Sequence, residues 1–173
     1  ISARPESGKD VPLLSTYDSF SSTFFSLKIG NKEYRLNKDS CASCRARKTP
    51  YGAQLAYTIK NKAVVVIDFS FMPSNAQSAR ADTLRVTSYI INTGKKEESF
   101  SLKAVFDTVL GESSGQHFST ATLKRVENEM QFDFMEKEKW ICSSDFETSV
   151  KFLLDGKGIT KPQVVTLANK DSL

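Results

Sequence analysis

Histidine is nearly absent from this sequence, and its scarcity limits the chemistry that the chain can carry. The 173 residues include one His, one Trp and three Met. A histidine-based triad would need His117 beside a nucleophile, and no motif marks such a nucleophile. The sequence also lacks a G-x-S-x-G elbow, an H-E-x-x-H zinc motif and a glycine-rich phosphate loop. These absences predict a protein that is not an enzyme.

Long apolar runs and clustered positive charge are missing as well. The longest apolar run, 63–67, is far shorter than the roughly 18 residues that a membrane-spanning helix needs. We therefore expect membrane attachment only through an anchor outside this chain. The net charge of +4 is dispersed, which argues against a nucleic-acid partner. The densest basic stretch, Arg45-Ala46-Arg47-Lys48, is typical of a solvated loop.

No sustained helical stripe is present, whereas strand-forming residues are frequent. Twelve Phe and five Tyr favour pleated, half-buried surfaces. Short alternating segments separated by turn signals predict about ten strands. They cover residues 23–29, 33–36, 54–60, 63–72, 84–92, 100–110, 118–123, 130–134, 139–142, 146–154 and 163–167. This pattern predicts an all-β fold, specifically a two-sheet antiparallel β-sandwich.

The predicted domain covers residues 19–173 and follows a flexible N-terminal arm at 1–18, which is rich in Ser and Pro and shows no period. The chain begins at Ile1 without a Met or a signal-like segment, which is typical of a mature or trimmed fragment of a larger protein. Other domains are therefore expected to precede or follow it.

Turn signals predict how neighbouring strands pair. Asn61-Lys62 is expected to form a two-residue turn, after which Val64 and Val66 point into the core. The strands at 84–92 and 100–110 are expected to pair with each other as a long hairpin. The polar, basic segment 37–49 is expected to be a loop of about 13 residues.

The three cysteines, Cys41, Cys44 and Cys142, allow three interpretations. A redox C-x-x-C site needs a helix N-terminus, and no helical pattern follows Cys44. A zinc site has the right number of ligands if His117 joins the cysteines, but these residues come from separate segments. The favoured interpretation is a structural disulfide, formed within the C-x-x-C pair or between one of its members and Cys142. A disulfide would place the protein in an oxidising, extracytoplasmic compartment, with one cysteine left unpaired.

An acidic segment around Asp107 and Glu112, with His117 close behind, is the second group of candidate residues. Asp107 and Thr108 end a predicted strand, where their side chains can hydrogen-bond the following turn. Asp107 and Glu112 also offer the hard oxygen ligands that calcium prefers. Further carboxylates for such a site are Asp133, Asp145 and Asp155. We take Asp107, Glu112 and His117 as candidate ligand-binding residues.

Aromatic side chains form the third group. Core packing is the default role for most of them, but a flat aromatic platform would suit a sugar ring, and an apolar patch would suit a neighbouring domain. The candidates near the N-terminal end are Tyr17, Phe20, Phe24, Phe25 and Tyr51.

The stretches Tyr89-Ile90-Ile91-Asn92-Thr93-Gly94 and 102–118, which contains Asp107-Thr108-Val109-Leu110-Gly111, resemble a pattern in β-sandwich domains of bacterial secreted and envelope proteins. Where that family has Asn-Asp-Gly, this chain has Ser113-Ser114-Gly115, which departs from the family's ligand-bearing turn. The layout of these domains is similar to carbohydrate-binding and mutarotase-like sandwiches, and to spirochaete envelope proteins that add a peptidoglycan-associated domain. The resemblance implies a sandwich fold and a cell-envelope location.

Taken together, these features predict a non-catalytic interaction module of a bacterial cell-envelope protein, located in the periplasm or at the cell surface. Its expected partner is a glycan or another domain of the same protein. Two alternatives stay open: a carbohydrate-active enzyme that uses Asp107 or Glu112 as paired carboxylates, and a structural domain stapled by zinc. No cofactor is expected, apart from the calcium or zinc just considered.

Overall fold

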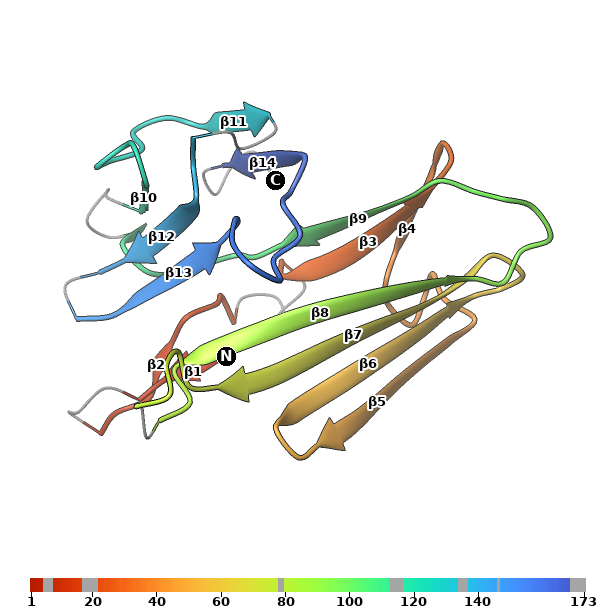
Figure 1. Ribbon diagram of the computed structural model, residues 1–173, viewed down its shortest axis with the longest axis horizontal. Helices are drawn as coiled ribbons and strands as arrows, with labels where there is room; N and C mark the ends of the chain where they lie inside the picture. The colour runs from red at the N-terminus through yellow and green to blue at the C-terminus, as the bar shows by residue number, and fades with distance from the viewer. Residues whose placement is uncertain are drawn as a thin grey trace. The chain divides into compact units, whose positions relative to one another are not determined.

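The computed structural model describes residues 1–4, 8–16, 22–77, 80–112, 117–133, 137–145 and 147–168. These residues form fourteen β-strands, and the strand pairs are antiparallel, so the predicted all-β fold is confirmed (Figure 1). Within these ranges, no helix has the length and hydrophobicity needed to cross a lipid bilayer.

The sequence predicted one domain over 19–173, whereas the structure divides the chain into two compact units. We call Phe24–Val105 the sandwich unit, and Ile1–Thr23 together with Phe106–Leu173 the terminal unit. Each unit is described by itself.

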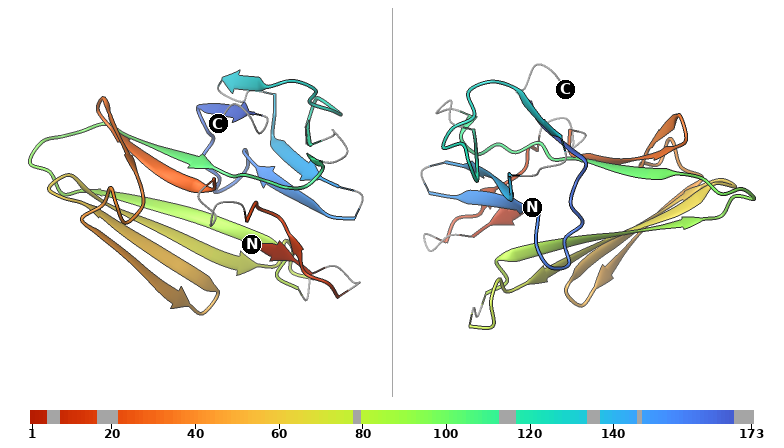
Figure 2. Two further views of the ribbon diagram at one scale, coloured as in Figure 1. Left: turned by 180° about the vertical axis from the view of Figure 1, so that it is seen from behind. Right: turned by 45° about the horizontal axis from the view of Figure 1, so that its top comes forward.

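Two sheets face each other in the sandwich unit (Figure 2). The smaller sheet has the strand order β4-β3-β9, with bounds Lys32–Arg35, Phe24–Ile29 and Phe100–Val105. The larger sheet runs β5-β6-β7-β8, with bounds Ser43–Thr49, Gly52–Ile59, Ala63–Met72 and Thr83–Asn92. This unit is the predicted two-sheet antiparallel sandwich, built from about half of the chain.

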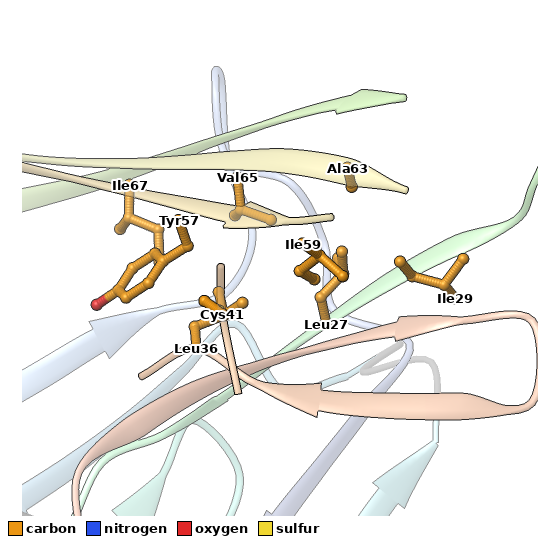
Figure 3. Packing of buried hydrophobic residues seen from close by; sticks show 9 residues of the cluster. All are labelled: Leu27, Ile29, Leu36, Cys41, Tyr57, Ile59, Ala63, Val65 and Ile67. Carbon is orange, nitrogen blue, oxygen red and sulfur yellow. The ribbon is translucent and has the colours of Figure 1, made fainter. Parts of the chain in front are cut away.

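The core of the sandwich unit lies between these two sheets (Figure 3). Leu27 and Ile29 of β3 point toward the buried side chains of the larger sheet, and Leu27, Val65 and Ile67 have no exposed surface. Alternate residues at the end of β6 and at the start of β7 are buried because successive side chains of a strand point to opposite faces of the sheet. The remaining buried members of the cluster are Leu36, Cys41, Tyr57, Ile59 and Ala63.

The turn between β6 and β7 is one residue longer than predicted, and this changes which side chains are buried. Ile59 pairs with Ala63, so the loop has three residues, and its middle residue, Asn61, adopts a left-handed φ of 57°. A shift of one residue moves every side chain of a strand to the other face. The prediction that Val64 and Val66 point into the core was therefore wrong, because their neighbours Ala63, Val65 and Ile67 fill it.

The predicted hairpin between the strands at 84–92 and 100–110 was also wrong. β8 pairs with β7, and β9 pairs with β3 in the opposite sheet. The connection at 93–99 crosses from one sheet to the other. Face-to-face sheets lie about 10 Å apart, a distance that seven residues span easily.

The segment predicted as a loop at 37–49 contains strand β5. Its seven residues pair along their whole length with β6, from Ser43 opposite Thr58 to Thr49 opposite Gly52. The basic residues Arg45, Arg47 and Lys48 are exposed, as predicted, but they lie on an edge strand. Charged side chains are typical of edge strands because they discourage pairing with another chain.

The terminal unit is made of shorter strands in three small sheets. Their strand orders are β1-β2, β10-β12-β13 and β11-β14. The bounds are Ser2–Ala3 (β1), Val11–Pro12 (β2), Phe118–Thr120 (β10), Met130–Asp133 (β11), Trp140–Ser144 (β12), Ser149–Leu153 (β13) and Val164–Leu167 (β14). Val126, Ile141 and Leu167 form the buried centre of a second hydrophobic cluster.

The N-terminal segment predicted as an arm without regular structure contains β1 and β2. It also pairs with the rest of the terminal unit: Leu14 forms a bridge with Thr108, and the Ser15 N–H donates to the Asp107 carbonyl at 2.7 Å. Leu14 and Ser15 are therefore held against the segment at 107–108, and the Leu13 N–H donates to the Ile1 carbonyl.

Candidate functional site

The acidic candidate site of the terminal unit contains one well-defined interaction. The Thr108 hydroxyl and Nε2 of His117 lie 2.7 Å apart, and the His117 ring stacks on Phe118 with 4.0 Å between centroids. Burial lowers the pKa of His117, while the charges of Glu112 and Asp107 act in the opposite direction. Because the net shift is downward, the imidazole is neutral at pH 7.

This geometry links the segments that carry Thr108 and His117 through their side chains. Thr108 is 2% exposed, so its hydroxyl is out of reach of a substrate. The Asp107 N–H donates to Thr23 Oγ1 at 3.1 Å, and its carbonyl accepts from Ser15. Glu112 is exposed. The predicted turn residues Ser113-Ser114-Gly115 lie outside the described residues. The segment acts as a junction between strand ends.

Within the described ranges, the structure contains no set of ligands for the zinc or calcium site considered above. No three side chains among His, Cys, Asp and Glu gather there closely enough to hold a metal ion. The structure therefore supports neither metal site. The zinc site would have used Cys41, Cys44, Cys142 and His117, and the calcium site Asp107 and Glu112.

The three cysteines are free thiols, so the predicted disulfide is not formed in this structure. Cys41 is buried in the sandwich core, and Cys44 is part of β5, where it lies directly opposite Tyr57. Burial raises the pKa of the Tyr57 phenol to about 12. Cys142 belongs to β12 of the terminal unit. Cys41 and Cys44 therefore pack in and against the core of the sandwich unit.

A thiol count tests this state directly. We expect three reactive thiols per chain when protein purified without reductant is unfolded and treated with a thiol reagent. In the folded protein Cys41 should react slowly, because burial raises its pKa and a thiol reacts as the thiolate. A count of one thiol per chain would show that a disulfide forms after all.

Glu138 is a buried carboxylate that the sequence pattern did not single out. It is 4% exposed, and it accepts hydrogen bonds from the Thr122 hydroxyl and from the Thr122 N–H, the latter at 3.1 Å. Burial alone would raise the pKa of Glu138, but the hydrogen bonds from Thr122 and Thr120 outweigh burial and lower it. Its role is to hold the turn after β10.

The stability contribution of Glu138 should depend on pH. A carboxylate whose pKa is lowered by folding stabilises the native state above its unfolded pKa of about 4.3, and this contribution disappears as pH falls through the folded pKa. We expect the stability difference between wild type and Glu138→Ala to be full above about pH 5 and to shrink below it, measured by urea unfolding. In a Thr122→Ala background this pH dependence should be smaller.

Exposed aromatic, aliphatic and polar side chains lie together on the outer face of the four-stranded sheet. Residues that pair directly across antiparallel strands share a face, so the strand registers give the outer face row by row. The three rows at its centre are Ser43-Thr58-Val64-Ile91, Arg45-Ala56-Val66-Tyr89 and Arg47-Gln54-Asp68-Thr87. We call this set of residues the outer face.

Tyr89 and Ile91 are the exposed apolar residues of the outer face, with 57% and 54% of their surface accessible. Beside them, Asp68 accepts a hydrogen bond from Gln54 Nε2 at 3.3 Å and another from the Ser70 hydroxyl at 2.6 Å. These bonds hold the carboxylate in place while Arg45 and Arg47 remain exposed. A face with an aromatic ring near one edge, a fixed acceptor on an inner strand and guanidinium donors at the other edge is suited to binding a polar ligand with a flat apolar side.

The sequence predicted a strand at 84–92 but did not mark either face of that strand as a site. Among the predicted aromatic candidates, Tyr51 is 73% exposed, and Phe25 packs against Phe69 with 6.1 Å between ring centroids. Arg35 lies over the ring of Phe24 at 4.0 Å. Tyr17 and Phe20 lie outside the described residues.

The structure defines the class of the protein: an all-β chain with a two-sheet antiparallel sandwich and an exposed mixed face on its larger sheet. No family model matches the chain, and no curated protein or solved structure matches it either.

Proposed function

We propose that the chain is a non-catalytic interaction module of a bacterial cell-envelope protein, and that it binds a glycan on the outer face. The observation that carries this proposal is the exposed Tyr89 ring on the same face as the fixed Asp68 carboxylate, with Arg45 at the opposite edge of that face. A sugar ring offers apolar C–H groups on one side and hydroxyls at its edge. The first suit an aromatic ring, and the second suit hydrogen-bonding side chains.

The shape of this surface favours a chain-like ligand. The outer face is a sheet surface, with an aromatic residue on the edge strand β8 and polar side chains on the inner strands and on β5. Such a surface can contact several units of a polymer at once. Its half-exposed aliphatic residues, Val64 and Val66, add apolar contact area between the polar groups.

The location in the cell envelope rests on the resemblance of the segment from Tyr89 to Phe118 to secreted sandwich domains. The free thiols remove the separate argument from a disulfide. We therefore propose an extracytoplasmic location on the resemblance alone, and fractionation of the native host tests it.

The Tyr89→Ala substitution tests the glycan proposal. We expect wild-type protein to bind members of a glycan array or to sediment with peptidoglycan, and Tyr89→Ala to weaken that binding by about tenfold or more, as removal of a central aromatic residue does. Tyr51→Ala is the matched control, because Tyr51 is also exposed but lies in the turn between β5 and β6. We expect its affinity to stay within about twofold of wild type.

Two outcomes would contradict the proposal. If wild type binds neither the array nor peptidoglycan, the outer face has no glycan ligand, and a neighbouring protein domain becomes the better candidate for it. If Tyr51→Ala and Tyr89→Ala weaken binding equally, the ligand does not lie on the outer face.

A further inference from the structure

A cavity of about 410 Å³ opens at one end of the sandwich unit, where the β6–β7 turn meets the connection between β8 and β9. Figure 1 shows these two segments at the same end of the unit. The lining residues are Asn61, Lys62, Thr93, Gly94, Lys95, Lys96 and Glu98. This cavity is distinct from the acidic segment of the terminal unit and from the buried core.

The walls of this cavity are held by hydrogen bonds. The Asn92 side chain accepts from the Gly94 N–H and donates to the Lys96 carbonyl, each at 2.8 Å. The Thr93 N–H donates to the Lys62 carbonyl at 3.0 Å, which ties the connection to the β6–β7 turn. The lysines of the two segments are therefore presented from a fixed backbone, which lowers the conformational cost of binding.

Positive charge dominates the cavity. Three lysines are among the residues that line it, against one acidic residue, Glu98. Among the ion pairs of the described residues, none joins a carboxylate to Lys62, Lys95 or Lys96. Lysines that line one cavity without an ion pair to a carboxylate give it a positive potential, which attracts an anion.

The cavity adjoins the outer face. Lys62 and Thr93 continue the pairing of β7 and β8 beyond the row that contains Val64 and Ile91. At about 3.4 Å per residue, Thr93 lies only about 14 Å along the strand from Tyr89. A glycan chain that contacts Tyr89 and follows β8 toward its end would reach the cavity.

We propose that this cavity binds an acidic substituent of the glycan, a carboxylate, sulfate or phosphate group, and that the protein therefore selects acidic over neutral glycans. This inference rests on the proposed function, since the sugar chain itself is placed on the outer face. The lysines supply the attraction to the anion, and Tyr89 supplies the contact with the sugar ring.

The test compares four proteins on an array of neutral glycans and of glycans that carry carboxylate, sulfate or phosphate. They are wild type, Tyr89→Ala, the cavity variant Lys62→Gln/Lys95→Gln/Lys96→Gln, and a control variant Lys28→Gln/Lys48→Gln/Lys103→Gln. The control removes the same charge from exposed lysines elsewhere in the sandwich unit. Fluorescence anisotropy with labelled dextran sulfate and unsulfated dextran of equal length gives affinities at several salt concentrations.

We expect wild type to prefer acidic glycans, the cavity variant to lose about tenfold or more of that affinity, and the control to lose far less. The affinity should also fall with added salt, and the cavity variant should show a shallower salt dependence. Circular dichroism of each variant checks that the fold is retained.

Equal losses in the cavity and control variants would overturn the inference, because they would show attraction to net charge alone. If wild type and the cavity variant both bind neutral and acidic glycans equally well, the inference about the cavity is overturned and the glycan proposal stays intact. If the binding of acidic glycans depends on the cavity lysines but not on Tyr89, the result supports the cavity as the anion site and contradicts the outer face as the glycan site. Absence of any glycan binding by wild type would overturn both.

Discussion

Leu27→Ala is expected to lower the free energy of unfolding by about 2–5 kcal/mol. Leu27 has no exposed surface and lies in β3, between Tyr34 of β4 and Leu102 of β9 along the sheet. Its side chain points across the core toward the four-stranded sheet (Figure 3). The substitution removes apolar contacts and leaves a cavity that the paired backbones of β4 and β9 prevent from collapsing.

Urea unfolding measured by circular dichroism gives this energy, with a lower midpoint and an unchanged slope as the expected result. Lys28→Ala is the matched control, because Lys28 is the next residue of the same strand and is exposed. We expect the control to change stability by no more than about 0.5 kcal/mol. A loss below about 1 kcal/mol for Leu27→Ala would mean that the two sheets do not pack together as the structure has them.

Local patterns were sufficient to predict many of the strands of the sandwich unit. The predicted strand at 63–72 has the same bounds as β7, and the one at 84–92 differs from β8 by one residue. Both segments combine β-branched and aromatic residues with polar turns on either side, and these signals act over a few residues.

The pairing of the strands was harder to predict, because the alternation of apolar and polar residues along a strand does not show which strands are its neighbours. β3 and β9 are adjacent in the sheet but about 70 residues apart in the chain. A connection of seven residues suits a hairpin or a crossing between sheets equally well, so the segment at 93–99 could not decide between them. The run 63–67 is apolar at every position, so its buried face was fixed only by the length of the preceding turn.

The candidate site was harder to predict than the fold for the same reason. Lys62 and Lys95 are separated by 33 residues in the chain, and only the pairing of β7 with β8 brings their segments together. The arginines of the outer face looked like loop residues, because a basic edge strand and a solvated loop share the same composition. Cys41 and Cys44 drew attention through their spacing, yet their environment is that of packed side chains.

Gly52→Ala is expected to destabilise the sandwich unit by about 1–3 kcal/mol or more through a steric clash. Gly52 begins β6 and lies between Thr49 of β5 and Ser70 of β7. A Cβ at this position would overlap the carbonyl oxygen of Phe69 and would lie 3.0 Å from its carbonyl carbon. Both atoms belong to the backbone, so no rotation of a side chain can relieve the overlap.

Relief of this clash requires β6 and β7 to separate locally, which threatens the hydrogen bond of 2.8 Å from the Phe71 N–H to the Tyr51 carbonyl. Thermal and urea unfolding should therefore show a lower stability, and hydrogen exchange should be faster at the Phe71 amide. Ala53→Ser is the control, because it adds one atom to the exposed neighbouring residue and is expected to change stability by no more than about 0.5 kcal/mol. If Gly52→Ala were as stable as this control, the close approach of β6 to the Phe69 carbonyl would be incorrect, and the glycine would have no steric role at the start of the strand.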